Sequence, residues 1–143
     1  MNEHRQHLSI LLVEDEPAIA LAQKDSLEQH GYSVRTVSSL EGAVVACESD
    51  GSIDLVLMDL DTGMDGTEAA RRILAHRELP IVFMSSHIEK EYVERALRVS
   101  NYGYVVKGTG DLMLIQSIEM AFRLFESHAS LERRAEASAE GRE

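Results

Sequence analysis

The chain has 143 residues, enough for one domain with a buried core. Its formal net charge is −11 and it has no run rich in Lys or Arg, which argues against direct nucleic-acid binding. The single cysteine, Cys47, excludes an intramolecular disulfide, and no apolar run is long enough for a membrane helix. We therefore expect a cytoplasmic domain without a signal peptide, in which Cys47 packs in the core rather than reacting.

Five short apolar runs are spaced along the chain. They cover residues 8–13, 32–37, 53–58, 81–84 and 102–106. The first and third contain almost only Ile, Leu, Val and Met without alternation, which is typical of strands covered on both faces. The second run alternates more and suits an edge strand.

Helical patterns separate these runs. Pro17 suits the first turn of a helix that Gly31 can close, and the Ser-Ser-Leu-Glu segment 38–41 has the pattern of a capping box. Apolar residues then recur at helical spacing in three segments: Leu40, Ala43, Val44 and Cys47; Ala70, Ile73 and Leu74; Val93, Ala96 and Leu97. Five repeats of strand and helix predict a parallel sheet with right-handed crossovers, whose ligands bind beyond the carboxyl ends of the strands.

The last helical segment begins near Asp111 and has two offset apolar stripes. They consist of Ile115, Ile118 and Phe122, and of Leu114, Ile118, Ala121 and Phe125. This pair is wider than one contact with a sheet requires. The pattern therefore predicts a second partner for this helix, either another copy of the chain or a following domain.

The same segment ends in a polar stretch. A helix that continues to about residue 135 would be roughly 37 Å long, and the alternative is a frayed tail from about Ser127. We divide the chain into an N-terminal extension (1–7), one domain (8–126) and a helical or frayed tail (127–143).

Polar side chains that could take part in catalysis or metal binding follow four of the predicted strands. Glu14 and Asp15 end the first strand, Asp59 the third, Ser85 the fourth and Lys107 the fifth. Because carboxyl ends of parallel strands meet at one edge, we expect these side chains to share one cleft. Two carboxylates about 5 Å apart repel by roughly 3 kcal/mol at an effective dielectric near 20. Either one acid takes a proton or a cation lies among them.

The chemistry of this predicted cleft suits phosphoryl transfer. A few oxygen ligands with room for water favour Mg²⁺. Asp59 beside such an ion can act as a nucleophile toward phosphorus. The metal and Lys107 would offset charge on the phosphoryl oxygens, and the Ser85 hydroxyl can donate a hydrogen bond to one of them.

Five motifs in order give the chain its resemblance to a known family. The segments are ILLVEDEP (10–17), DLVLMD (54–59), MDG (64–66), LPIVFMS (79–85) and YGYVVK (102–107). From about residue 8 to residue 125, the chain resembles the receiver domains of bacterial two-component systems. The resemblance implies a flavodoxin-like α/β fold, (βα)5, with strand order 2-1-3-4-5 and an extended C-terminal helix.

The resemblance also implies a phosphoacceptor and a metal site. Asp59 would receive a phosphoryl group from a histidine kinase or phosphotransfer protein. Glu14, Asp15 and Asp59, with the backbone carbonyl of Asp61, would hold Mg²⁺. Such a protein would be a signalling switch and not an enzyme, because it would catalyse only its own phosphorylation and dephosphorylation.

Three further residues match the switch of this family. Ser85 and Tyr104 would form the switch pair, in which the hydroxyl moves to the phosphate and the aromatic ring turns inward. Lys107 would pair with the phosphate. The expected change is a shift between two packings of one fold.

The sequence departs from the family pattern at three places. The loop after Asp59 is one residue short, and Gly63 stands near the position of a usual proline. Gly108 follows Lys107 where the family has a cis proline, so we expect a trans bond and a looser loop. Asp61 adds a carboxylate two residues after the acceptor. It is either a solvated loop acid or a residue that alters the lifetime of the phosphoryl group.

Two other functions fit part of the pattern. The segment 59–63, DLDTG, resembles the first motif of haloacid-dehalogenase-type phosphatases, and Ser85 and Lys107 could serve their later steps. That motif normally follows the first strand, however, whereas this one follows the third. The other alternative is a receiver-like docking or dimerisation module that is not phosphorylated, which the short loop and Gly108 would suit.

Overall fold

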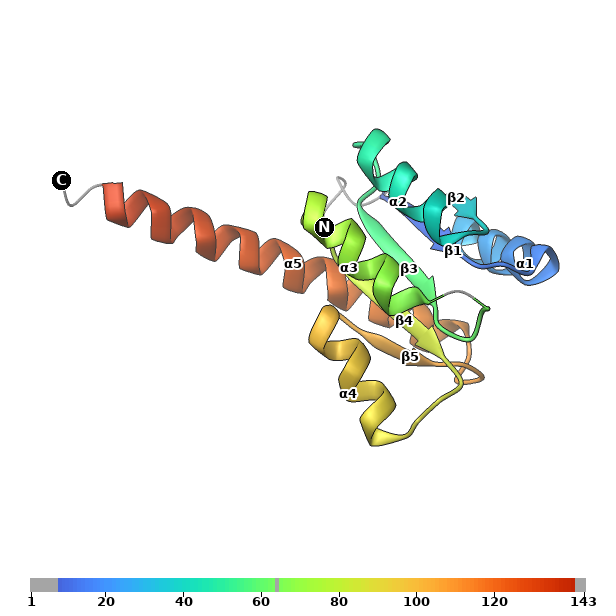
Figure 1. Cartoon of the computed structure of the whole chain (residues 1–143). Helices are drawn as coiled ribbons and strands as arrows, with labels where there is room; N and C mark the ends of the chain where they lie inside the picture. Colours follow the sequence, from blue (N-terminus) through green and yellow to red (C-terminus); the bar gives the residue numbers. More distant parts are fainter. Residues whose placement is uncertain (1–7, 64, 141–143) are drawn as a thin grey trace.

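Five parallel strands form one sheet in a computed structural model that describes residues 8–63 and 65–140 (Figure 1). The strands are β1 (Ser9–Val13), β2 (Ser33–Val37), β3 (Leu55–Asp59), β4 (Ile81–Ser85) and β5 (Tyr104–Val106). Their order is β2-β1-β3-β4-β5, and each pairs in parallel with its neighbours. The predicted flavodoxin-like architecture is therefore confirmed, and the alternating run forms edge strand β2.

Helices cover both faces of the sheet. They are α1 (Pro17–Gln29), α2 (Leu40–Ser49), α3 (Gly66–His76), α4 (Lys90–Val99) and α5 (Asp111–Glu140). One core layer lies between the sheet and α2, α3 and α4, and the other lies between the sheet and helices α1 and α5. The nearly unbroken apolar sequence of β1 and β3 follows from this burial on both faces.

Local signals set several helix ends as predicted. Pro17 opens α1, and Gly31 follows its end with a φ of +94°, a conformation that glycine adopts without steric cost. The capping box prediction was wrong by one residue. Ser39, not Ser38, caps α2 by accepting a hydrogen bond from the Gly42 amide at 2.9 Å. Glu41 is thereby moved out of the capping position and pairs with Arg72 of α3.

The two apolar stripes of α5 face the same core layer, which corrects the prediction that they are too wide for one contact. The buried residues from both stripes are Leu114, Ile115, Ile118, Ala121 and Phe122. The helix packs against β4 and β5, and residues of both stripes are buried together on the side that faces them. The apolar side chains that stay exposed on α5 are different ones: Leu112, Met113, Met120, Leu124 and Leu131.

Helix α5 extends well past the sheet (Figure 1). Near its exit, the Tyr102 hydroxyl lies 3.0 Å from Nδ1 of His128, and the Tyr102 ring meets Phe125 edge-on. Over the described residues the tail is helical as far as Glu140. No helix in this part of the chain is long and apolar enough to cross a bilayer.

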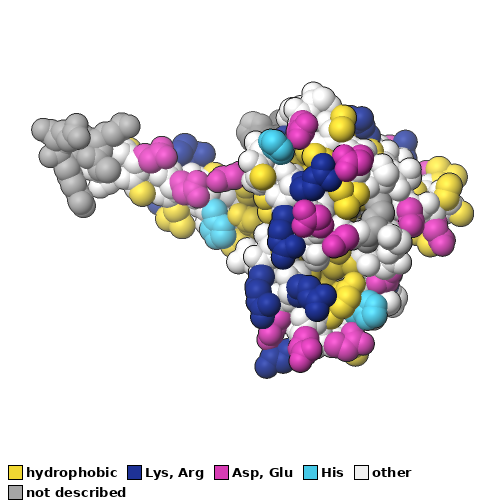
Figure 2. Space-filling view, viewed as in Figure 1, with side chains coloured by type: hydrophobic (Ala, Val, Ile, Leu, Met, Phe, Trp, Pro, Cys, Tyr) yellow, Lys and Arg dark blue, Asp and Glu magenta, His cyan; other side chains and the backbone are white. Residues whose placement is uncertain are grey.

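Acidic and basic side chains intermingle on the face that carries α3 and α4 (Figure 2). Ion pairs join residues within one helix and between helices, as between Arg72 and Glu41 and between Lys90 and Glu94. Most are exposed, so each contributes little to stability.

Candidate functional site

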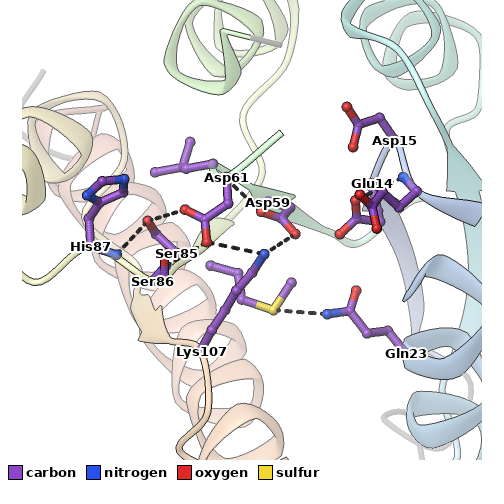
Figure 3. Close-up of polar contacts among 12 residues, drawn as sticks. Glu14, Asp15, Gln23, Asp59, Asp61, Ser85, Ser86, His87 and Lys107 are labelled. Carbon is purple, nitrogen blue, oxygen red and sulfur yellow. Dashed lines mark hydrogen bonds and ion pairs between the residues drawn. The ribbon is translucent and has the colours of Figure 1, made fainter. Parts of the chain in front are cut away.

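The polar residues predicted at the strand ends lie at the carboxyl edge of the sheet (Figure 3). Asp59 is the last residue of β3 and Ser85 the last of β4, while Glu14 directly follows β1 and Lys107 directly follows β5. Parallel pairing aligns these ends, because Asp59 lies opposite Met84 and Ser85 opposite Val106. The sheet therefore brings together residues that lie far apart in the sequence.

Asp59 forms a buried ion pair with Lys107. Lys107 Nζ lies 2.7 Å from Asp59 Oδ2, and the Asp59 side chain is only 1% exposed. The other carboxylate oxygen, Oδ1, accepts a hydrogen bond of 2.8 Å from the Asp61 amide. Burial acts to lower the pKa of Lys107, but contacts with Asp59 and Asp61 outweigh it and raise that pKa. Lys107 is thus held as a cation beside a buried carboxylate.

Glu14 is the second buried acid of the site. One of its oxygens, Oε2, accepts from the Glu16 amide at 3.1 Å, whereas Oε1 is buried without a hydrogen-bond partner. Burial raises the pKa of Glu14 to about 7, and the neighbouring Asp59 carboxyl adds to the increase. Glu14 is therefore protonated more easily than an ordinary carboxyl, in the direction of one of the two solutions expected for crowded acids.

Asp15 turns toward the loop after β3. Its Oδ2 accepts a hydrogen bond of 3.1 Å from the Gly63 amide. Across the described residues, His, Cys, Asp and Glu side chains do not gather in a group of three or more that could hold a metal as they stand. The predicted ligands still suit a hard cation, because Glu14 offers an unpartnered buried oxygen beside Asp59. The metal ligands, including the Asp61 carbonyl, stay a prediction.

Asp61 makes contacts that the sequence did not reveal. Its Oδ1 accepts from the Ser85 hydroxyl at 2.9 Å, and its Oδ2 accepts from the Ser86 amide at 2.8 Å and lies 3.3 Å from Lys107 Nζ. Its side chain is 20% exposed. Burial acts to raise the pKa of Asp61, but hydrogen bonds from Ser85 and Ser86 prevail and the pKa is lowered. Asp61 is therefore an exposed loop residue, as one of the two alternatives had it, but its carboxylate is held by contacts across the site. Its effect on the lifetime of the phosphoryl group stays a prediction.

The predicted switch residues lie next to each other. Tyr104 is partly buried against the core layer beneath α3 and α4, and its hydroxyl donates to the His87 carbonyl at 2.9 Å. The His87 amide in turn donates to the Ser85 hydroxyl oxygen at 3.1 Å. The His87 ring stacks on Tyr92 with 4.3 Å between ring centroids. The loop after β4 thus connects Ser85 to Tyr104.

Two glycines shape the loops of the site. A Cβ atom on Gly66 would lie 2.6 Å from Leu60 Cδ2, so glycine allows α3 to begin close against β3. Gly108 has a φ of +88°, and no peptide bond among the described residues is cis, which confirms the trans bond predicted after Lys107. Met64, part of the MDG motif, lies outside the described residues.

Sequence reasoning missed Ser86 and His87. Both act through backbone groups, an amide toward Asp61 and an amide and a carbonyl toward the switch residues. Such contacts cannot be predicted from residue type, because nearly every residue has the same backbone groups. Their position directly after the hydroxyl residue of β4 was the available signal.

The family model of the response regulator receiver domain matches residues 10–119. The chain belongs to the receiver domain family. It is a receiver domain of the kind found in two-component response regulators, as the five motifs in its sequence had predicted. This membership leaves the phosphatase alternative without support.

Curated relatives of this receiver domain include transcriptional regulatory proteins. It is 31% identical over 124 residues to the transcriptional regulatory protein PdtaR of Mycobacterium tuberculosis, covering 86% of this chain and 60% of that protein. It is 30% identical over 138 residues to the C4-dicarboxylate transport transcriptional regulatory protein DctD of Rhizobium meliloti, covering 93% of this chain and 30% of that protein. The chain thus spans between about a third and three fifths of these relatives.

Solved structures share the fold of this receiver domain. One is the N-terminal domain of a response regulator/sensory box/GGDEF 3-domain protein from Carboxydothermus hydrogenoformans, with 38% identity and a TM-score of 0.76. That match covers 85% of this chain and 98% of the other. The signal receiver domain of a modulated diguanylate cyclase from Desulfovibrio desulfuricans has 36% identity and a TM-score of 0.72, covering 84% and 97%.

Proposed function

We propose that this receiver domain is a magnesium-dependent switch that accepts a phosphoryl group on Asp59. The observation that carries the proposal is the buried Asp59 carboxylate with Lys107 Nζ 2.7 Å from its Oδ2. A buried carboxylate beside a cation is positioned to act as a nucleophile, and the same cation can then neutralise the group that it acquires.

The proposed reaction transfers a phosphoryl group to an Asp59 carboxylate oxygen, either from an oxygen of acetyl phosphate or from a nitrogen of phosphohistidine. An Asp59 oxygen forms a bond to phosphorus while the bond from phosphorus to the leaving group breaks. With acetyl phosphate, acetate leaves and takes up no proton. With a phosphohistidine donor, the bond to nitrogen breaks and the imidazole departs. Lys107 and the donors around Ser85 would stabilise charge on the phosphoryl oxygens.

Magnesium would be held by Glu14, Asp15 and Asp59, with the Asp61 carbonyl as a further ligand. When bound it would neutralise charge on the phosphoryl group. The unpartnered Oε1 of Glu14 supports this role, because a buried acid beside another acid gains from a nearby cation.

The proposed partners follow from this chemistry. The phosphoryl donor is a histidine kinase or a phosphotransfer protein, and the last helix is the route to another copy or to a following domain. We propose no direct contact with nucleic acid and no membrane partner, because the net charge is −11. We also propose that the chain is no enzyme beyond its own modification, and that it acts in the cytoplasm, where its lone cysteine stays reduced.

Intact-mass spectrometry after incubation with acetyl phosphate and Mg²⁺ tests the proposal. Wild type should gain the mass of one phosphoryl group, and Asp59→Asn should gain none. Asp54→Asn is the matched control, because Asp54 directly precedes β3, at the other end of the strand from Asp59. Its carboxylate accepts a hydrogen bond from the Ser9 amide. This variant should be labelled like wild type. Omitting Mg²⁺ should abolish labelling of wild type and of Asp54→Asn.

Other outcomes identify the alternative functions. A folded wild-type protein without label would indicate a docking module. Repeated turnover of a phosphomonoester would indicate a phosphatase. Labelling of Asp59→Asn at the wild-type level would refute Asp59 as the acceptor.

A further inference from the structure

The Asp61 carboxylate is surrounded by groups suited to a phosphoryl group. A hydroxyl, a backbone amide and an ammonium converge on its two oxygens, from Ser85 at 2.9 Å, Ser86 at 2.8 Å and Lys107 at 3.3 Å (Figure 3). These groups come from the ends of β4 and β5, whereas Asp61 comes from the loop after β3. The contacts therefore cross the site and are not local turn bonds.

A phosphoryl group on Asp59 would need the same donors. It carries negative charge on several oxygens, which ammonium and oriented N–H and O–H groups stabilise. Lys107 already bridges Asp59 and Asp61, so a group attached to Asp59 would meet the donors that Asp61 now occupies. Two anions cannot share three donors without strong repulsion.

We infer that the Asp61 carboxylate is an internal stand-in for the phosphoryl group, holding its binding positions in the unphosphorylated chain and giving them up on phosphorylation. The inference rests on the proposed function and adds a regulatory residue to it. It concerns the side chain of Asp61, which is distinct from the carbonyl proposed as a metal ligand.

The arrangement of the switch residues agrees with this inference. Ser85 directs its hydroxyl to Asp61, and Tyr104 is packed partly against the core with its own hydroxyl on the His87 carbonyl. A hydroxyl turned to an anion is one feature expected of the phosphorylated packing, whereas the Tyr104 ring is only half-buried. Asp61 thus occupies the partner position at Ser85 in the absence of phosphate.

Removing the carboxylate should free the donors. Asp61→Ala should bind beryllofluoride, with Mg²⁺ present, about tenfold more tightly than wild type, because an anionic competitor is lost. Asp61→Asn keeps the size of the side chain but loses its charge, and should also bind more tightly. Asp25→Ala is the matched control, because it removes one acid from an exposed position on α1. Its affinity should equal that of wild type.

A second readout needs neither metal nor phosphate. In ¹H–¹⁵N spectra of the metal-free protein, the Ser86 amide should move upfield in Asp61→Ala, because its hydrogen bond to the carboxylate is lost. The amide of Ser9, which donates to Asp54 at the far end of the sheet, should not move. If Asp61→Ala fails to fold, Asp61→Asn still gives the affinity readout, because it loses the charge while keeping one acceptor oxygen for the Ser86 amide.

The outcomes separate this inference from the proposed function. Beryllofluoride adducts of equal affinity in wild type and both variants, with an unchanged Ser86 amide, would overturn the inference alone. Absence of an adduct from every protein, together with no phosphoryl label on wild type, would overturn the proposed function and with it the inference. Tighter binding in both Asp61 variants together with a shifted Ser86 amide would support it.

Discussion

Lys107 and Asp59 form an ion pair in which the carboxylate is buried and the ammonium is partly exposed. The Nζ–Oδ2 distance is 2.7 Å, and the side chains are 29% and 1% exposed. The strand ends place the two residues: β5 leads into Lys107, and β3 ends in Asp59. A charge buried to this degree depends on its partner, so this pair links the stability of the domain to its chemistry.

Replacing Lys107 by Met should lower the free energy of unfolding by about 2 kcal/mol in the presence of a metal chelator. Breaking a buried pair costs about 3–5 kcal/mol, and the partial exposure of Lys107 reduces that cost. In an Asp59→Asn background the same change should cost less than half as much, because no buried charge is left alone. Urea unfolding of the four proteins measures the difference. An equal loss of unfolding free energy in both backgrounds would contradict the coupling between Lys107 and Asp59.

The thiol of Cys47 should be unreactive in the folded protein. Cys47 is 3% exposed, and burial raises its pKa from 9.0 to about 11. At pH 8 the thiolate fraction should then be about a hundredfold lower than in the unfolded chain. A chromogenic disulfide reagent should react rapidly in urea and very slowly in buffer, and the rate in buffer should rise with pH up to about 11. A rate in buffer equal to that in urea would contradict the prediction.

The same pKa shift predicts how stability depends on pH in the alkaline range. The folded-state pKa of Cys47 is raised, so its contribution is complete below pH 9 and is lost as pH rises through about 11. Cys47→Ala should reduce this loss. Chemical unfolding of both proteins between pH 8 and pH 11 measures it, and parallel curves would refute the assignment to Cys47.

Gly66→Ala should destabilise the domain by about 1–3 kcal/mol. The added Cβ would lie 2.6 Å from Leu60 Cδ2 and 3.2 Å from Met58 Cγ, so neighbouring side chains must shift. Gly51→Ala is the matched control, because a Cβ there meets nothing within 4 Å. Thermal and urea unfolding should show a loss for Gly66→Ala and almost none for Gly51→Ala. Equal effects would show that close approach at Gly66 is unimportant.

Two substitutions on α5 test which of its faces belongs to the core. Ile118 is fully buried, so Ile118→Ala should cost about 2–5 kcal/mol. Leu131 is 57% exposed on the helical extension, and Leu131→Ala should change stability by less than about 0.5 kcal/mol. Urea unfolding at low protein concentration measures both. A large loss for Leu131→Ala would indicate that another surface covers the extension in solution.

The site was largely predictable from sequence, because strand pairing aligns the ends of parallel strands. Glu14, Asp59, Ser85 and Lys107 each end or follow an apolar run, and the sheet then brings them to one edge. Tyr104 needed the family resemblance, since one aromatic residue on a short strand has no distinctive spacing. Asp61 was noticed as unusual, yet nothing in its neighbourhood along the chain predicts contacts with residues 24 positions away.

Some helix ends were likewise predictable from sequence, whereas others depended on the tertiary structure. Pro17 and Gly31 act through their own backbone preferences, so their positions in the sequence were sufficient. The capping box over residues 38–41 placed the cap of α2 one residue early, and the structure has Ser39 as the cap. For α5, periodicity identified the apolar residues, but only the tertiary packing showed that members of both stripes share one core layer.

The sequence by itself determined the order of strands and helices, because hydrophobic periodicity is a local property. It also determined the edge at which the polar residues meet and placed Asp59 and Lys107 in one site, because parallel pairing aligns strand ends in every such sheet. The partner of each charge was decided only by the tertiary structure. Whether Lys107 serves Asp59 alone or also Asp61, and whether Ser85 meets a carboxylate, depends on how the loop after β3 directs Asp61 across the sheet edge. That direction results from contacts between segments distant in the chain, which no local pattern encodes.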